Sequence, residues 1–176
     1  MTSVGVNYAQ ALYDLAKDEN LTGQILEELH VLNTAFLQEP GFLRLLAAPN
    51  ISKQERCDAL DNCIRGKVHP YVLNFMKLLT EKGYARHFED CCKAYEEQYN
   101  EDNGILSVRA VSAVALTDAQ IQKLTGKLER ITGKKVQLHN RVDPDCLGGI
   151  RLDYDGKRLD GTVQHRLEEV GALLKG

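Results

Sequence analysis

Apolar residues recur every three or four positions along the first hundred residues, the spacing that brings side chains to one face of an α-helix. Successive stripes of this kind, with a short helical turn over 42–47, predict five or six helices. The stripes are Val4, Tyr8, Leu12 and Leu15; Ile25, Leu29, Leu32 and Phe36; Cys57, Leu60 and Ile64; Val72, Phe75 and Leu79; and Phe88, Cys92, Tyr95 and Tyr99. Because helices of this length are marginal alone, we expect the stripes to pack together as an all-helical bundle.

Helix boundaries are marked by recognisable end signals. Pro40-Gly41 follows the second stripe and His69-Pro70 precedes the stripe that starts at Val72. Ser52 stands three residues before Glu55, the spacing of a capping box, so a helix is predicted to start there. Gly83 is predicted to end the following helix, because glycine readily adopts the left-handed conformation of a helix C-terminus.

After Asn103-Gly104 the period of the pattern changes from helical to alternating. Alternation from Leu106 to Val114 predicts a strand, and further strands are predicted over 136–141, 150–154 and 157–159, with a turn at Asp155-Gly156. Two helices accompany them: one capped by Thr117, with Ile121, Leu124, Leu128 and Ile131 facing inward, and one capped by Thr162, with Val163, Leu167, Val170 and Leu174 on one side. The chain is therefore predicted to be α+β, with a helical domain at 1–104 and a small α/β domain of about four strands and two helices at 105–176.

The charge balance changes at the same place. The net charge is −3, but residues 1–104 carry 10 Lys and Arg against 16 Asp and Glu, whereas residues 105–176 carry 12 against 9. This shift supports the boundary, and it fits either two domains that face different partners or two ordinary solvated surfaces. The pI is near 6.0 and the small basic group at Lys134, Lys135 and Arg141 has no interleaved aromatic residues, so nucleic-acid binding is not expected.

Redox, metal and nucleophilic chemistry find little support in the sequence. The five cysteines have irregular spacing without Cys-x-x-Cys, and Cys57 and Cys92 fall on apolar helix faces, where cysteine behaves as a small hydrophobe. The five histidines are scattered and form no His-Glu-x-x-His motif. We expect no bound metal, no cofactor and no catalytic residue.

The glycines and aspartates of the second half are better explained by turns than by a ligand. Gly148-Gly149 belongs to no phosphate-binding motif, and glycine there can provide a backbone turn. Asp143, Asp145, Asp153, Asp155 and Asp160 could in principle bind a divalent cation, but their spacing matches no calcium loop. Asp143 before Pro144 and Asp160 before Gly161-Thr162 fit turn and cap roles.

No apolar run is long enough to cross a bilayer, and no secretory signal is evident. Cytoplasmic residence is therefore expected.

Four segments, in this order, resemble one known family: Tyr8-Ala9-Gln10-Ala11-Leu12-Tyr13-Asp14-Leu15-Ala16; Leu46-Ala47-Ala48-Pro49-Asn50-Ile51-Ser52; Leu78-Leu79-Thr80-Glu81-Lys82-Gly83; and Val142-Asp143-Pro144-Asp145-Cys146-Leu147-Gly148-Gly149-Ile150, followed by Leu159-Asp160-Gly161-Thr162-Val163. The chain resembles, over nearly its whole length, the delta subunit of F-type ATP synthases, whose mitochondrial counterpart is the oligomycin-sensitivity-conferring protein. The resemblance implies a non-catalytic stator subunit at the cytoplasmic face of the bacterial plasma membrane, attached to that membrane only through the complex.

The resemblance also implies partners for each domain. The helical bundle would bind N-terminal helices of alpha subunits in a groove that includes Tyr8, Ala11, Leu78 and Leu79, and the α/β domain would hold the C-terminal end of the peripheral-stalk b subunits. The family signature in the second half is Asp143, Gly148, Gly149, Asp160 and Gly161. Judged from the residues alone, the groove residues could equally belong to the core of the bundle.

Two positions depart from the family pattern. Tyr84 stands where many members have arginine, although Arg86 is close by, and Gly161 stands where many have serine. Two other functions stay open: a helical adaptor whose α/β part binds an unrelated partner, and a small metal- or nucleotide-dependent enzyme that uses the aspartates.

Overall fold

The chain forms two compact units in a computed structural model that describes residues 3–146, 148–154 and 156–162. The first unit is Met1–Tyr99 and the second is Asn100–Gly176. The division falls near the C-terminal end of one helix, α6 (Phe88–Asp102). Each unit is described by itself below.

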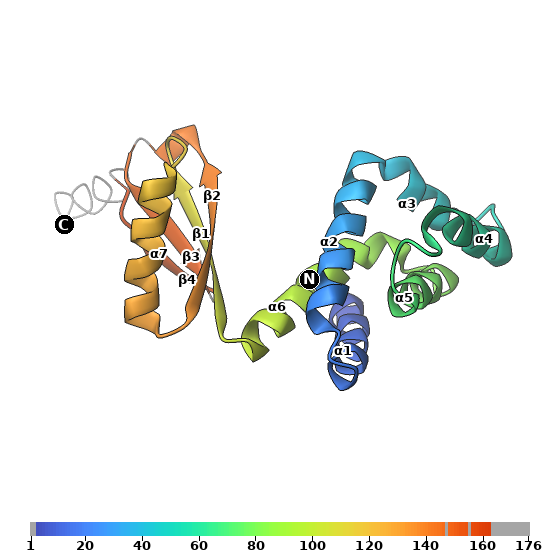
Figure 1. The fold of residues 1–176 in the computed structure, drawn as a ribbon. Helices are drawn as coiled ribbons and strands as arrows, with labels where there is room; N and C mark the ends of the chain where they lie inside the picture. Colours follow the sequence, from blue (N-terminus) through green and yellow to red (C-terminus); the bar gives the residue numbers. More distant parts are fainter. Residues whose placement is uncertain (1–2, 147, 155, 163–176) are drawn as a thin grey trace. The chain divides into compact units, whose positions relative to one another are not determined.

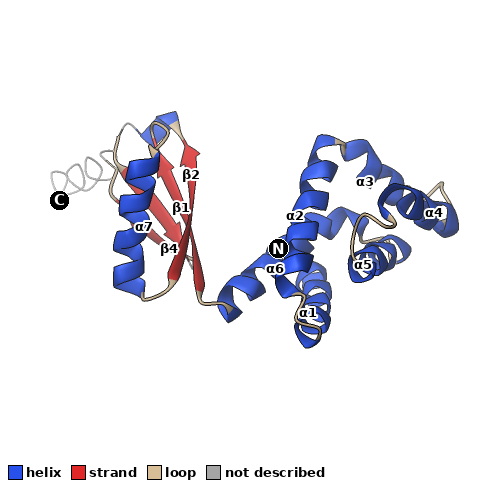
Figure 2. Cartoon of the chain, in the orientation of Figure 1, coloured by secondary structure: helices blue, strands red, loops and turns tan. Residues whose placement is uncertain are grey.

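The first unit is entirely helical in its described residues (Figures 1 and 2). Before α6 it contains α1 (Ser3–Asp18), α2 (Thr22–Gln38), α3 (Pro40–Leu46), α4 (Lys53–Ile64), α5 (Pro70–Glu81) and a single 3₁₀ turn, η1 (Ala85–His87). The prediction of an all-α bundle of five to six helices is confirmed.

The predicted end signals are used as expected. The Ser52 hydroxyl accepts a hydrogen bond from the Glu55 amide at 3.2 Å, and the Glu55 carboxylate accepts one from the Ser52 amide at 3.0 Å, which completes the capping box of α4. His69 precedes α5, and its Nδ1 accepts a hydrogen bond from the Tyr71 amide at 3.3 Å. Gly83 has φ +79° directly after α5, a conformation that favours glycine.

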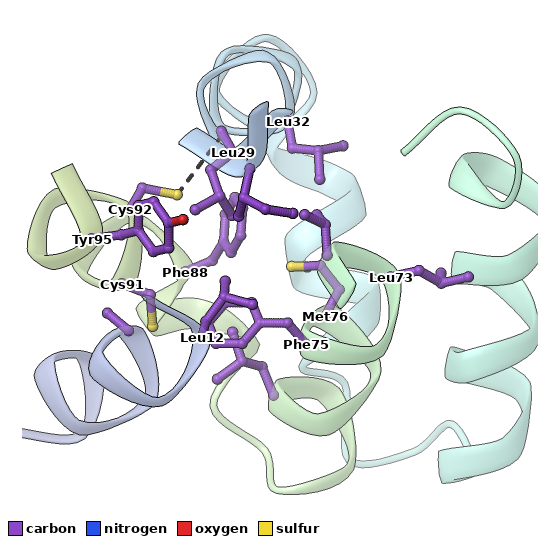
Figure 3. Packing of buried hydrophobic residues seen from close by; sticks show 14 of the residues in the cluster. Leu12, Leu29, Leu32, Leu73, Phe75, Met76, Phe88, Cys91, Cys92 and Tyr95 are labelled. Carbon is purple, nitrogen blue, oxygen red and sulfur yellow. Dashed lines mark hydrogen bonds between the residues drawn. The ribbon is translucent and has the colours of Figure 1, made fainter. Parts of the chain in front are cut away.

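One face of α6 lies at the centre of the bundle core (Figure 3). Phe88 and Tyr95 are both fully buried. The Phe88 ring packs edge-on against Phe36 of α2 with centroids 5.3 Å apart, and the Tyr95 ring packs in the same way against Tyr13 of α1 at 5.1 Å. The Tyr95 hydroxyl donates a hydrogen bond to the carbonyl oxygen of Thr22 at 3.1 Å. A polar group that would otherwise be costly to bury is thereby satisfied at the start of α2.

The first helix does not bury the face that the sequence predicts. Leu12 is buried, but Leu15 is 43% exposed, so its predicted place in the core is wrong. The buried face of α1 consists mainly of small residues and carries Gly5, Ala9, Leu12, Tyr13 and Ala16. Small side chains let neighbouring backbones approach closely, and Val4, Tyr8 and Leu15 lie on the flank beside this face.

The second unit is a four-stranded mixed sheet with one described α-helix against it (Figure 2). Its elements are β1 (Ile105–Ser112), α7 (Asp118–Thr132), β2 (Lys135–Val142), the 3₁₀ turn η2 (Pro144–Cys146), β3 (Ile150–Tyr154) and β4 (Lys157–Asp160). The strand order is β2-β1-β3-β4, with β1 and β2 parallel and the other pairs antiparallel. The predicted α+β class and the four strands are confirmed. The helix predicted after Thr162 lies outside the described residues.

The helix between the two parallel strands begins and ends as predicted. Thr117 and Gln120 form a capping box, and Gly133 ends α7 at φ +68°. Leu128 is buried and Leu124 packs against the same small core, which contains Leu106 and Val108 of β1.

Two apolar residues of this unit are not where the pattern places them. Ile131 is 81% exposed, although it lies on the same side of α7 as Leu124. Ile131 belongs to the last turn of the helix. Its position on that side does not determine whether the sheet extends far enough to cover it. Val114 is 72% exposed because β1 ends at Ser112, so the alternation no longer applies to it.

We predict that residues 1–104 fold on their own, because one continuous core cluster connects α1 to α6. The fragment should show a helical circular dichroism spectrum and a single cooperative thermal transition, with the full chain as control. A broad, non-cooperative transition would contradict this prediction.

Candidate partner-binding surfaces

One flank of α1 carries apolar side chains that the bundle does not cover. Val4, Tyr8, Ala11 and Leu15 follow one another at spacings of four, three and four residues, so they lie along one side of the helix. Val4 and Tyr8 are half-buried, and Ala11 and Leu15 are exposed. This flank lies beside the buried face of α1 and continues the apolar character of that face to the surface.

A corresponding flank exists on α5. On one side of this helix, the Lys77 ammonium group contacts the Asp61 carboxylate of α4 at 2.7 Å. Tyr71, Phe75 and Leu78, spaced by four and three residues, lie on the opposite flank. Phe75 is buried in the core and Leu78 is 39% exposed. Leu79 is fully buried, so it supports this flank from beneath and does not line it.

The two helices share one core, and a surface contact joins α1 to the segment that follows α5. Leu12 of α1 and Phe75 of α5 belong to the same buried core cluster (Figure 3). At the surface, the Tyr8 ring contacts the Tyr84 ring just after α5, with centroids 5.9 Å apart. Tyr84, one of the two departures from the family pattern, therefore makes an aromatic contact to α1. We refer to Val4, Tyr8, Ala11, Leu15 and Leu78 as the α1–α5 apolar surface.

The glycines of the second-half signature lie at a close backbone crossing. Gly149 has φ +87°, and a Cβ atom at this position would lie 2.5 Å from the carbonyl oxygen of Gly161 and 2.8 Å from the Cα atom of Thr162. The Gly161 amide donates a hydrogen bond to the carbonyl oxygen of Ile150 at 3.1 Å. Gly148 has φ +147°, so the turn before β3 uses two positive-φ glycines. The signature glycines thus allow the backbone at the start of β3 to approach the backbone at the end of β4. Their role is structural.

The signature aspartates are engaged in local hydrogen bonds. Asp143 Oδ1 accepts a hydrogen bond from the Asp145 amide at 3.2 Å. Asp160 Oδ1 accepts hydrogen bonds from the Thr162 amide at 2.9 Å and from the Thr162 hydroxyl at 2.6 Å. Both are the turn-forming contacts expected from the sequence. In the described part of the chain, no group of three or more His, Cys, Asp or Glu is placed to hold a metal ion.

Two of the cavities in the described part of the chain are lined by residues outside the α1–α5 apolar surface. One of about 190 Å³ lies between the start of α4 and the end of α5, and is lined by Lys53, Gln54, Cys57, Glu81 and Lys82. The other, of about 320 Å³, is lined by Leu124, Ile150, Leu152, Leu159, Asp160 and Gly161. Neither has the arrangement of a nucleophile and an oriented base that covalent catalysis needs.

Most of the cysteines lie in the protein interior, and Cys63 is exposed. Burial raises the pKa of the Cys91 thiol to about 12, and burial likewise raises the pKa of Cys57 and Cys92. The Cys92 thiol points at the carbonyl oxygen of Leu29, with Sγ and oxygen 3.8 Å apart. Thiols that remain protonated near neutral pH are poor nucleophiles and poor metal ligands, so these three cysteines act as small core residues.

Sequence reasoning missed part of the α1–α5 apolar surface. Tyr8, Ala11 and Leu78, which the family resemblance places in the groove, reach the surface, whereas the helical stripe predicts a core position for Leu15. The signal that could have identified Leu15 is the run of Gly5, Ala9 and Ala16 on the neighbouring face, because small residues at helical spacing mark a face of close packing.

A helical unit with an uncovered apolar surface, followed by a small α/β unit whose carboxylates are used in turns, is typical of subunits that act by binding other polypeptides. None of the described helices is long and apolar enough to span a lipid bilayer.

Comparison with known proteins identifies the family of this binding subunit. The family model for the ATP synthase delta (OSCP) subunit matches residues 4–174. The chain is 33% identical over 172 residues to ATP synthase subunit delta of Lacticaseibacillus casei, with 97% of this chain and 94% of the relative covered. It is 32% identical over 164 residues to the same subunit of Alkaliphilus oremlandii, with 93% and 91% covered. A chain of the Toxoplasma gondii mitochondrial ATP synthase hexamer shares the fold, with a TM-score of 0.81 at 20% identity and 99% of both chains covered.

The chain therefore belongs to the ATP synthase delta (OSCP) family. As a member of this family it is a stator subunit of an F-type ATP synthase, and so a component of an enzyme complex.

We predict that Gly149→Ala destabilises the second unit by about 2–4 kcal/mol, because the substitution combines an unfavourable positive φ with overlap against the Gly161 and Thr162 backbone. Urea unfolding followed by circular dichroism measures the change. The matched control is Gly126→Ala in α7, where an added Cβ meets nothing within 4 Å; it should be neutral or stabilise by about 0.5–1 kcal/mol. Equal stability of the two variants would show that the close crossing is not required.

Proposed function

We propose that this chain is the non-catalytic link between the catalytic head and the peripheral stalk of the synthase. In this proposal its helical unit binds N-terminal helices of alpha subunits, and its α/β unit holds the C-terminal end of the b subunits. It acts at the cytoplasmic face of a bacterial plasma membrane and reaches that membrane only through the complex. The link resists rotation of the head, so that turning of the central stalk is coupled to ATP synthesis or hydrolysis.

The observation that carries the proposal is the α1–α5 apolar surface. An amphipathic helix binds by placing apolar residues at i, i+3, i+4 and i+7 against such a surface. Ala11 leaves room for a close backbone approach, while Leu15 and Leu78 offer apolar area that water covers in the chain alone. The shared core beneath, through Leu12 and Leu79, holds the two flanks in position.

A metal-dependent enzyme has less support. Asp143 and Asp160 accept hydrogen bonds within their own turns, and Asp153 pairs with Arg158 at 2.8 Å. A metal site would need these carboxylates to converge on one point with free lone pairs.

We predict that Leu78→Asp weakens binding of a synthetic alpha-subunit N-terminal peptide by about tenfold or more, because a carboxylate would be desolvated in an apolar contact. Ala11→Trp should have a similar effect by blocking close approach. Peptide affinity and thermal stability are measured together by fluorescence anisotropy and circular dichroism.

The matched control for this experiment is Leu37→Asp, which places the same charge on α2 at a leucine that is 65% exposed. It should change the affinity by less than about twofold, as expected for an exposed site outside the contact. Equal losses from Leu78→Asp and Leu37→Asp would place the alpha contact elsewhere. A collapse in stability with normal binding by the remaining folded protein would make Leu78 a core residue.

We predict that removing residues 105–176 leaves ATP hydrolysis by the catalytic head intact but abolishes ATP-driven proton pumping in reconstituted membranes. The active sites lie on other subunits in this proposal, whereas torque requires an unbroken mechanical path from head to membrane. The assay compares full-length chain, fragment 1–104 and no addition. Pumping that survives with the fragment would mean that the α/β unit is dispensable for anchoring, and loss of hydrolysis would point to a catalytic or regulatory role.

A further inference from the structure

The sheet of the second unit has two chemically different faces. The register places Leu106 beside Val136 and Val108 beside Leu138, and these residues pack with Leu124 and Leu128 of α7. The alternate residues of the same strands point to the other face. Among the described residues the turn η2 packs against β1 and Val111 on this face is buried, whereas Ser107, Arg109, Gln137, His139 and Arg141 are exposed. We call this the open sheet face.

Cationic side chains gather on the open sheet face from all four strands. In the pairing register, Arg109 of β1 lies beside His139 of β2 and opposite Asp153 of β3. The next row contains Arg141, Val111 and Arg151, with Asp160 of β4 opposite Arg151. On its four strands this face carries Lys135, Arg109, Arg141, Arg151 and Arg158 against two carboxylates, Asp153 and Asp160.

The two carboxylates do not balance these cations. Asp153 contacts Arg158 at 2.8 Å and Arg151 at 3.7 Å, and Asp160 accepts two hydrogen bonds from Thr162. Arg109 and Arg141 have no ion pair in the described part of the chain, and the register makes them diagonal neighbours on the paired strands β1 and β2, a spacing of about 7–8 Å. The Nε atom of Arg151 is buried without a hydrogen-bond partner. This excess positive charge stands out in a chain whose net charge is −3.

The chemistry of the face favours one kind of partner. Besides its cations and carboxylates the face has Ile105, Ser107, Val111, Gln137 and His139, so it offers one imidazole but no Phe, Tyr or Trp ring on which successive nucleic-acid bases could stack. It also exposes no large apolar side chain that could insert into a bilayer. Guanidinium groups on neighbouring strands match carboxylates, which they can bind in a bidentate manner.

We propose that the open sheet face is the docking surface for an acidic segment of another polypeptide, with Arg109 and Arg141 as its principal contacts. That the partner is the C-terminal part of the b subunit rests on the proposed function above; the acidic character of the segment rests on the face alone. Complementary charge speeds association and selects the partner, and the contact weakens as ionic strength rises.

The test uses the full-length chain and the double substitution Arg109→Gln/Arg141→Gln. Its matched control is Lys123→Gln/Lys127→Gln, which removes the same charge from exposed residues of α7. Three probes are titrated at low and high salt: the soluble part of the b subunit, a labelled glutamate-rich peptide and a single-stranded oligonucleotide. Circular dichroism verifies that both variants are folded.

The expected result is that Arg109→Gln/Arg141→Gln weakens b-subunit binding by about tenfold and reduces its salt dependence, while the α7 control changes it by less than about twofold. If the unsubstituted chain does not bind the b subunit, the proposed attachment to the stalk is wrong. In that case, binding of the glutamate-rich peptide that is lost in Arg109→Gln/Arg141→Gln still supports the docking surface. Equal losses in the two variants, or tighter binding of the oligonucleotide than of both polypeptides, would overturn the proposal.

Discussion

Burial of one face of α6 is the interaction on which the helical unit depends. Through Phe88 this helix meets α2, and through Tyr95 it meets both α1 and the first residue of α2. A helix of 15 residues gains little stability alone, so its aromatic contacts with α1 and α2 determine whether the bundle closes. Burial raises the pKa of the Tyr95 hydroxyl, which therefore remains a neutral hydrogen-bond donor to Thr22.

The same core explains why the surface above it is available for a partner. Because Ala9 and Ala16 let α1 pack closely through its small-residue face, Tyr8, Ala11 and Leu15 remain on the flank. The α1–α5 apolar surface is thus a consequence of how the core is packed.

In the second unit too, the path of the backbone determines which side chains lie together at the surface. The crossing of Gly149 and Gly161 joins β3 to the end of β4, and the strand register then determines which residues share a face. Arg109, Arg141 and Arg151 come from separate stretches of chain and become neighbours only in the sheet. For this reason the sequence suggested no more than a small basic group near Lys134, Lys135 and Arg141, whereas the sheet gathers five cations on one face.

The sequence by itself determined the elements and their ends, because these depend on interactions between residues close in the chain. The helical stripes, the capping boxes at Ser52 and Thr117, the glycine ends at Gly83 and Gly133 and the change of period after Gly104 are all of this kind. Only the tertiary structure decided which flank of α1 is buried, that Leu79 lies beneath the surface while Leu78 reaches it, and that Ile131 is exposed. A periodic pattern shows that two residues share a side of a helix, but whether that side meets water, core or a partner depends on residues far away in the chain.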